Sequence, residues 1–160
     1  MDKLFCFGCD SNKWPDVISG HVHNWPDIVA KGLELELVHS RGNTNKEIWE
    51  RVQYYFFNQK TTKDLVIIQW TYLDNQSLEC ITNTNLLIHH TNLMLNKHGI
   101  ENYNLFVRSG FPRELFNDVQ FLDCRRDECS EQQHGQNVLE EIKKAKETLT
   151  MYVNSSIMEQ

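Results

Sequence analysis

Positive charge is scarce in this sequence. Its 160 residues contain 16 lysines and arginines against 22 aspartates and glutamates, and the formal net charge is -6. Nucleic-acid binding requires a basic face that displaces counterions from phosphates, so we expect no nucleic-acid partner. The remaining composition, 40% hydrophobic and 24% charged, is that of a globular chain, and the length suits a single domain spanning residues 1–160.

Long apolar runs are missing as well. The most apolar stretches, residues 65–70 and 86–88, are interrupted within a few residues, and neither approaches the ~20 residues that a membrane-spanning helix needs. Residues 1–5 show neither a long apolar signal region nor a small-residue cleavage site. We therefore expect a protein that has no membrane partner and is located in the cytoplasm.

The cysteines form no regular framework. There are five of them, and an odd number without regular spacing fits reduced thiols better than a disulfide scaffold. Cys6, Cys9, His21 and His23 carry the ligand types of a tetrahedral zinc site, but not the spacing of a zinc finger. Cys6 also falls in a predicted strand, where a thiol usually serves as a small core residue. A zinc-binding module is therefore only an alternative, and no cofactor is expected.

Strand and helix patterns alternate along the chain. Short apolar or β-branched runs predict strands at residues 3–8, 34–38, 64–71, 104–107 and 119–122. Helices are expected to begin near residues 26, 44, 77 and 130, and capping boxes mark the starts at Thr44 and Ser130. Gly32 is expected to end the first helix. This order predicts a three-layer α/β/α sandwich with a parallel, flavodoxin-like, doubly wound sheet.

The last helix carries an apolar stripe that identifies the side packed on the domain. The residues of this stripe are Val138, Ile142, Ala145, Leu149 and Tyr152. Their alternating four- and three-residue spacing keeps them on one side of a helix. Residues from about 152 to 160 are expected to form a frayed tail.

In a doubly wound sheet, ligands bind at the carboxyl ends of the strands. The segments 8–24, 39–45, 70–77 and 123–133 should therefore meet at one edge. They contain the motifs Phe7-Gly8-Cys9-Asp10-Ser11, Gly42-Asn43-Thr44-Asn45, Gln69-Trp70-Thr71 and Asp127-Glu128-Cys129.

In their order and spacing these motifs resemble those of the SGNH (GDSL-type) hydrolase superfamily, particularly its small phage-type members. The resemblance covers most of the chain and implies acyl transfer. A serine after the first strand would attack an ester carbonyl, a histidine before the last helix would take the proton of the serine, and an aspartate would orient the histidine. The resemblance also implies a phage or viral source, in which case the location is the host cytoplasm.

The positions of the catalytic groups depart from the family pattern. The nucleophile position holds either Asp10 or Ser11, depending on how the first turn is aligned. The Asp-x-His motif of the family matches Asp127 but places Cys129 where the base should stand. His134 lies in the first turn of the last helix, about one helical turn further along the chain.

Four residues are assigned to ligand or oxyanion binding: Gly42, Asn45, Trp70 and Trp14. Gly42 leads into a helix start whose free N–H groups suit an oxyanion, a carboxylate or a phosphate. An alternative interpretation of this segment is that Thr44 only caps the helix and no ligand binds there. Trp14 stands in a polar loop, which favours a functional role, whereas Trp70 lines the cleft or packs at the margin of the core.

The sequence thus predicts an SGNH-like protein with a degenerate or rewired triad. It is expected to bind a small ester or sugar ligand, or a host protein, through the former active-site pocket. The alternative is an active esterase or deacetylase that uses Ser11 on small esters or acetylated sugars.

Overall fold

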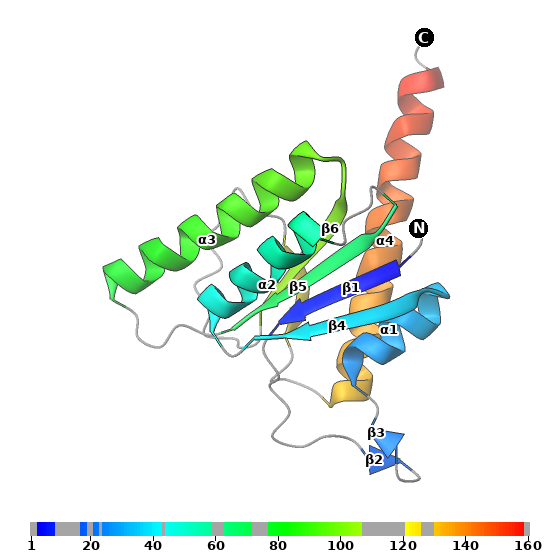
Figure 1. Ribbon diagram of the computed structural model, residues 1–160. Coiled ribbons are helices and arrows are strands. Elements are labelled where there is room, and N and C mark those ends of the chain that lie inside the picture. Colours follow the sequence, from blue (N-terminus) through cyan, green and yellow to red (C-terminus); the bar gives the residue numbers. More distant parts are fainter. Residues whose placement is uncertain are drawn as a thin grey trace.

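The computed structural model describes residues 3–8, 17–18, 21–22, 24–42, 44–58, 63–71, 77–106, 121–125 and 130–158. Their main feature is a five-stranded, all-parallel sheet in the order β4-β1-β5-β6-β7 (Figure 1). Its strands are β1 (Lys3–Gly8), β4 (Glu36–Arg41), β5 (Leu65–Trp70), β6 (Glu101–Phe106) and β7 (Phe121–Arg125). Two short strands, β2 (Val17–Ile18) and β3 (His21–Val22), form a separate antiparallel pair.

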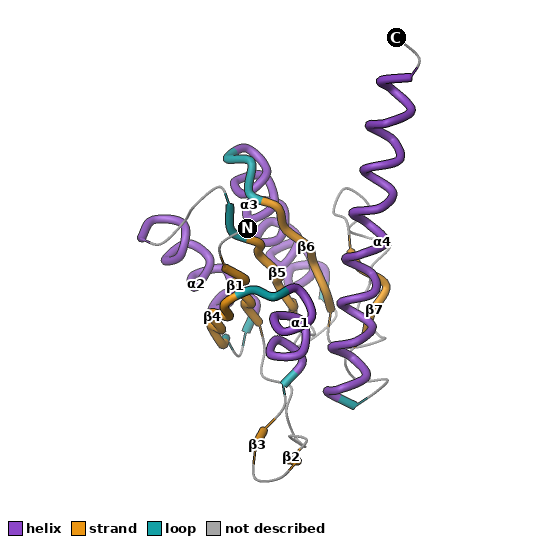
Figure 2. Tube along the Cα trace, turned by 90° about the vertical axis from the view of Figure 1, so that its right-hand side faces the viewer, coloured by secondary structure: helices purple, strands orange, loops and turns teal. Residues whose placement is uncertain are grey.

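Helices cover both faces of the sheet. The described residues contain α1 (Trp25–Leu33), α2 (Asn45–Asn58), α3 (Leu78–Lys97) and α4 (Glu131–Met158). Helices α2 and α3 lie on one face, and α1 and α4 on the other (Figure 2). The structure therefore confirms the predicted flavodoxin-like, three-layer α/β/α fold. None of the helices in these ranges is both long and apolar enough to span a membrane.

Strand β5 is the centre of the core. All six of its residues are buried, and its alternating side chains enter both apolar clusters. Val66, Ile68 and Trp70 face α2 and α3, whereas Leu65 and Ile67 face α1 and α4. Each fully buried aliphatic side chain stabilises the fold by about 1.5–3 kcal/mol, and the continuous apolar run of this strand predicted its central place.

Local capping groups fix the starts of the helices. The Thr44 hydroxyl oxygen accepts the Glu47 N–H at 3.1 Å, and the Ser130 hydroxyl oxygen accepts the Gln133 N–H at 3.1 Å. Both predicted starts are therefore confirmed. Ser77 caps α3 in the same way, accepting the Cys80 N–H at 3.2 Å. Such a cap is worth about 1 kcal/mol.

The expected end of α1 was wrong. Gly32 lies inside the helix, and Glu34 provides the left-handed stop, with a φ of 57°. A Cβ at Gly32 would collide with the Leu139 side chain of α4, and one at Gly135 would come within 2.8 Å of Ile28 on α1. The two glycines therefore allow the close approach of α1 and α4, a contact that local sequence does not reveal.

Other boundaries also differ from the predictions. β4 begins at Glu36 rather than at residue 34, because the turn at Glu34 comes first. β6 begins at Glu101, three residues earlier than expected and two residues after Gly99, whose positive φ ends the α3 region. α4 continues to Met158, through most of the expected tail. Leu149 is 64% exposed, so its side chain is not part of the face that packs on the domain.

Candidate functional site

The candidate site lies at the carboxyl edge of the sheet. Because the five strands are parallel, Gly8, Trp70 and Arg125 all end strands at this edge. The segments that follow β1 and β7 consequently leave the sheet on the same side, as predicted. Doubly wound folds place their ligands at this edge.

Gly8 and Gly42 join the ends of β1 and β4. The Gly42 N–H donates to the Gly8 carbonyl oxygen at 2.8 Å. A Cβ at Gly8 would lie 2.7 Å from the carbonyl oxygen of Gln69, so only glycine allows β1 to approach β5 this closely. The N–H assigned to the oxyanion is thus already used inside the fold, and the role predicted for Gly42 requires correction.

Asn45 fastens the start of α2 to the end of β5. Its side-chain oxygen accepts the Thr71 N–H at 2.9 Å, and its side-chain nitrogen donates to the Thr71 carbonyl oxygen at 3.3 Å. Asn45 is buried, and both polar atoms of its amide are engaged with backbone. It therefore positions Thr71 with one of its two amide N–H groups, and its role in ligand binding stays a prediction.

Trp70 belongs to the core and not to a ligand cleft. Its side chain is fully buried, and the indole N–H donates to Asn104 Oδ1 at 2.9 Å. Asn104 in turn donates to Asn92 Oδ1 of α3 at 2.7 Å. This network satisfies the polar tip of a large aromatic side chain inside the α2–α3 face, so the predicted ligand contact is replaced by a structural one.

His134 lies at the opposite side of the sheet, in the first turn of α4. Its ring is fully buried, with Nε2 2.9 Å from Gln69 Oε1. Because an amide oxygen only accepts, Nε2 carries the proton in this bond. The Trp25 ring packs edge-on against the imidazole, with 5.5 Å between ring centroids. A general base must reach the proton that it removes, and this imidazole instead connects α4 to β5.

Two buried polar atoms at this edge have no hydrogen-bond partner among the described residues: Gln69 Nε2 and Thr71 Oγ1. Gln69 is fully buried and Thr71 is 4% exposed. A buried donor without a partner costs roughly 1–3 kcal/mol, so two such atoms near the end of one strand make this edge a candidate site for polar atoms from outside the described fold.

Sequence reasoning missed the roles of Gln69 and Thr71. One signal was present: Gln69 follows Leu65 and Ile67 at alternate positions of a strand. A polar residue in a series of buried apolar positions indicates a specific polar partner. The identity of that partner, His134, could not be inferred from the pattern.

Several predicted site residues lie outside the described residues: Asp10, Ser11, Trp14, Asp127 and Cys129. Of the potential zinc ligands, Cys9 and His23 also lie outside them. His21 is described only as part of β3. Their predicted roles therefore remain predictions.

Cys6 is the one potential zinc ligand whose surroundings are described. Its side chain is fully buried among apolar residues of the α1–α4 face. Burial, together with the charge of Asp27, raises the pKa of the thiol well above its ordinary value. Zinc binds the thiolate, so this environment favours a core role. No group of three metal-binding side chains occurs within the part of the chain that the structure describes.

The chain was compared with protein-family models, curated proteins and solved structures. No protein in these comparisons, and no family model, matches it. The fold assignment therefore rests on the strand order and the two helical layers, and the resemblance to SGNH hydrolases rests on the sequence motifs.

Proposed function

We propose that this protein is an SGNH-like domain that binds a small ligand at the carboxyl edge of its sheet without hydrolysing it. One observation carries the proposal. Gly42, Asn45 and His134, the described residues expected to serve acyl transfer, each direct a polar group to another part of the fold.

Those internal bonds remove much of what ester hydrolysis needs. The loss of one oxyanion donor typically lowers kcat by about 100- to 1000-fold. A serine without a correctly placed base remains a neutral hydroxyl, and a poor nucleophile at neutral pH. With Gly42, Asn45 and His134 engaged, the residual rate should be close to that of the uncatalysed reaction.

The polar atoms at the end of β5 support binding. Gln69 Nε2 is a buried donor, and Thr71 Oγ1 both donates and accepts. A ligand with carbonyl or hydroxyl oxygens would satisfy both groups. Small esters and acetylated sugars have this chemistry, and a few convergent polar groups in an otherwise apolar setting are typical of small-molecule sites.

Hydrolysis is tested with p-nitrophenyl acetate. We expect the parent chain and Ser11→Ala to release nitrophenol equally slowly. Asp10→Ser places a serine at the other possible nucleophile position. A gain of activity in this variant would show that Asp10 occupies the position of a lost nucleophile. Turnover by the parent chain that Ser11→Ala abolishes would establish the active-esterase alternative.

Binding is tested by NMR with ¹⁵N-labelled protein and N-acetylglucosamine as the probe. We expect saturable shifts of the Gln69 side-chain amide and of the Thr71 N–H. The Gln53 side-chain amide is a matched control, because its Nε2 is also buried without a partner among the described residues but lies on α2. Shifts that are absent, or equal at Gln53 and Gln69, would contradict a site for this ligand class at the carboxyl edge.

A further inference from the structure

Large apolar side chains are exposed unevenly over the described residues. Seven are largely exposed, and five of these belong to α2 and α3. The five are Tyr54, Phe57, Leu78, Leu86 and Leu93. Helices α2 and α3 together form the layer on one side of the sheet (Figure 2), so these side chains share one outer face. Concentrated apolar exposure of this kind marks an interaction surface.

One line of residues on α3 organises this face, and we name it the α3 stripe. Its members follow one another at intervals of three or four positions and are all exposed. They are Glu79, Thr82, Leu86, His90, Leu93 and Lys97. This spacing places them on one side of the helix. Trp49 of α2 lies alongside, because its indole N–H donates to His90 Nδ1 at 3.0 Å.

The charge of this face is balanced, unlike that of the whole chain. Residues 80–96 contain no aspartate, glutamate, lysine or arginine. Helices α2 and α3 together carry three acidic residues (Glu47, Glu50 and Glu79) and three basic ones (Lys46, Arg51 and Lys97), which sum to zero. Two copies with a net charge of -6 each repel one another, and this face allows contact with least repulsion.

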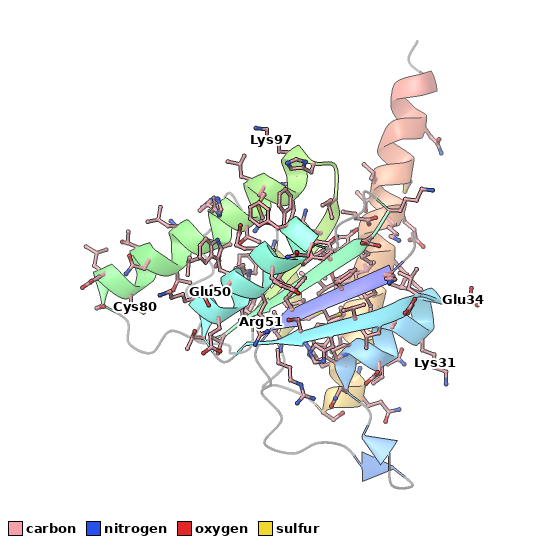
Figure 3. The ribbon with its side chains drawn as sticks, in the orientation of Figure 1. Lys31, Glu34, Glu50, Arg51, Cys80 and Lys97 are labelled. Carbon is pink, nitrogen blue, oxygen red and sulfur yellow. The ribbon has the colours of Figure 1, made fainter. Side chains whose placement is uncertain are left out.

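The stripe is complementary to itself when two copies run antiparallel. Glu79 lies in the first turn of α3 and Lys97 in its last turn. The stripe therefore has an acidic side chain at one end and a basic side chain at the other (Figure 3, where Cys80 and Lys97 are labelled). An antiparallel pair about the middle of α3 places Glu79 of each copy beside Lys97 of the other. The Leu86 side chains of the two copies then lie close to the two-fold axis, about 6 Å apart along the helix direction, and Leu93 of each copy packs near Thr82 of the other.

We propose that the α3 stripe is a dimer interface between two copies of this chain, with the two α3 helices packed antiparallel. The interface is isologous, because the same residues of both copies contribute. Leucines supply the central apolar contact, and the Glu79–Lys97 pairs at both ends fix the direction of pairing. The α2 side chains Trp49, Tyr54 and Phe57 extend the contact beyond a single helix. This inference is independent of the proposed ligand site.

Sedimentation velocity over a range of concentrations tests the interface on the full chain. We expect a monomer–dimer equilibrium, and Leu86→Glu should raise its Kd by about 10-fold or more, because each dimer buries this leucine twice. Leu149→Glu is the matched control, since Leu86 and Leu149 are equally exposed at 64% but Leu149 lies on α4. A chain that stays monomeric, or equal weakening by both substitutions, would overturn the proposal and leave the face to a different partner.

Charge reversal tests the antiparallel direction. Glu79→Lys places two lysines side by side at each end of the pair and should raise the Kd by about 3- to 10-fold, a modest effect because exposed ion pairs are weak. Lys97→Glu should do the same, and the double variant should recover the parent Kd. A double variant that dimerises no better than the single variants would rule out this register, even where the leucine substitutions weaken association.

Discussion

Two buried polar networks, one on each face of the sheet, differ in how far the fold satisfies them. On the α2–α3 face, the Trp70 indole reaches Asn104, and Asn104 and Asn92 donate to each other's side-chain oxygens. On the α1–α4 face, Gln69 meets His134 through its oxygen, and its nitrogen has no hydrogen-bond partner among the described residues. The first network is satisfied within the fold, whereas the second still has hydrogen-bonding capacity near the carboxyl edge.

This difference separates a structural network from one suited to function. A fully satisfied buried network stabilises one arrangement of the core. A buried amide with an unused donor instead reduces stability, and such groups usually have a functional explanation. We therefore expect substitutions on the α2–α3 face to lower stability most, and those on the α1–α4 face to affect ligand binding as well.

The largest effect is expected for Asn104→Ala. The substitution leaves the Trp70 N–H and the Asn92 amide without their buried acceptor, which should lower the free energy of unfolding by about 2–4 kcal/mol. Urea denaturation followed by circular dichroism measures it. Asn102→Ala, at a more exposed position two residues along the same strand, is the control and should cost clearly less. Equal losses would mean that the Asn104 network adds no stability of its own.

A smaller effect is expected on the other face. Gln69→Leu keeps the approximate size of the side chain but removes the acceptor of His134, and should cost about 1–2 kcal/mol. Combining it with His134→Leu should cost less than the sum of the two single substitutions, because neither polar partner is then left alone. Additive losses would show that the 2.9 Å contact contributes no coupling energy.

Gln69→Leu should also change ligand binding, which separates the two networks by function. It should abolish the response to N-acetylglucosamine, since the unused donor is lost, whereas Asn104→Ala should retain that response in its folded fraction. A retained response in Gln69→Leu would move the binding site away from the end of β5.

Contacts between residues close together in the sequence could be predicted from it, whereas contacts between distant residues could not. The caps at Thr44 and Ser130 were predicted because donor and acceptor are three residues apart. The apolar run of β5 likewise identifies a central strand without reference to the rest of the chain. Together with the alternation of elements, these local signals were sufficient for the fold.

The site depends on contacts that no local pattern encodes. Asn45 binds Thr71 across 26 residues, and His134 meets Gln69 across 65. Residue types alone indicated donors for an oxyanion and a histidine base, but the fold uses the same groups to join its own elements. Gly32 illustrates the same limit, because its role is set by Leu139 on a different helix.

The smallest expected effect is a pH dependence that originates on the α1–α4 face. Burial raises the pKa of Cys6 above its ordinary 9.0, so above pH 9 the unfolded chain loses a proton that the folded chain retains. The contribution of Cys6 to the free energy of unfolding should therefore be constant below pH 9 and fall as the pH rises further. Burial also raises the pKa of Tyr103 above its ordinary 10.0, which adds a second decline at higher pH.

Urea midpoints between pH 8 and pH 10 measure the first decline. Cys6→Ala should flatten it, although the cavity lowers stability at every pH, and Cys80→Ala should leave it intact. An unchanged slope in Cys6→Ala would show that the buried thiol is not its source.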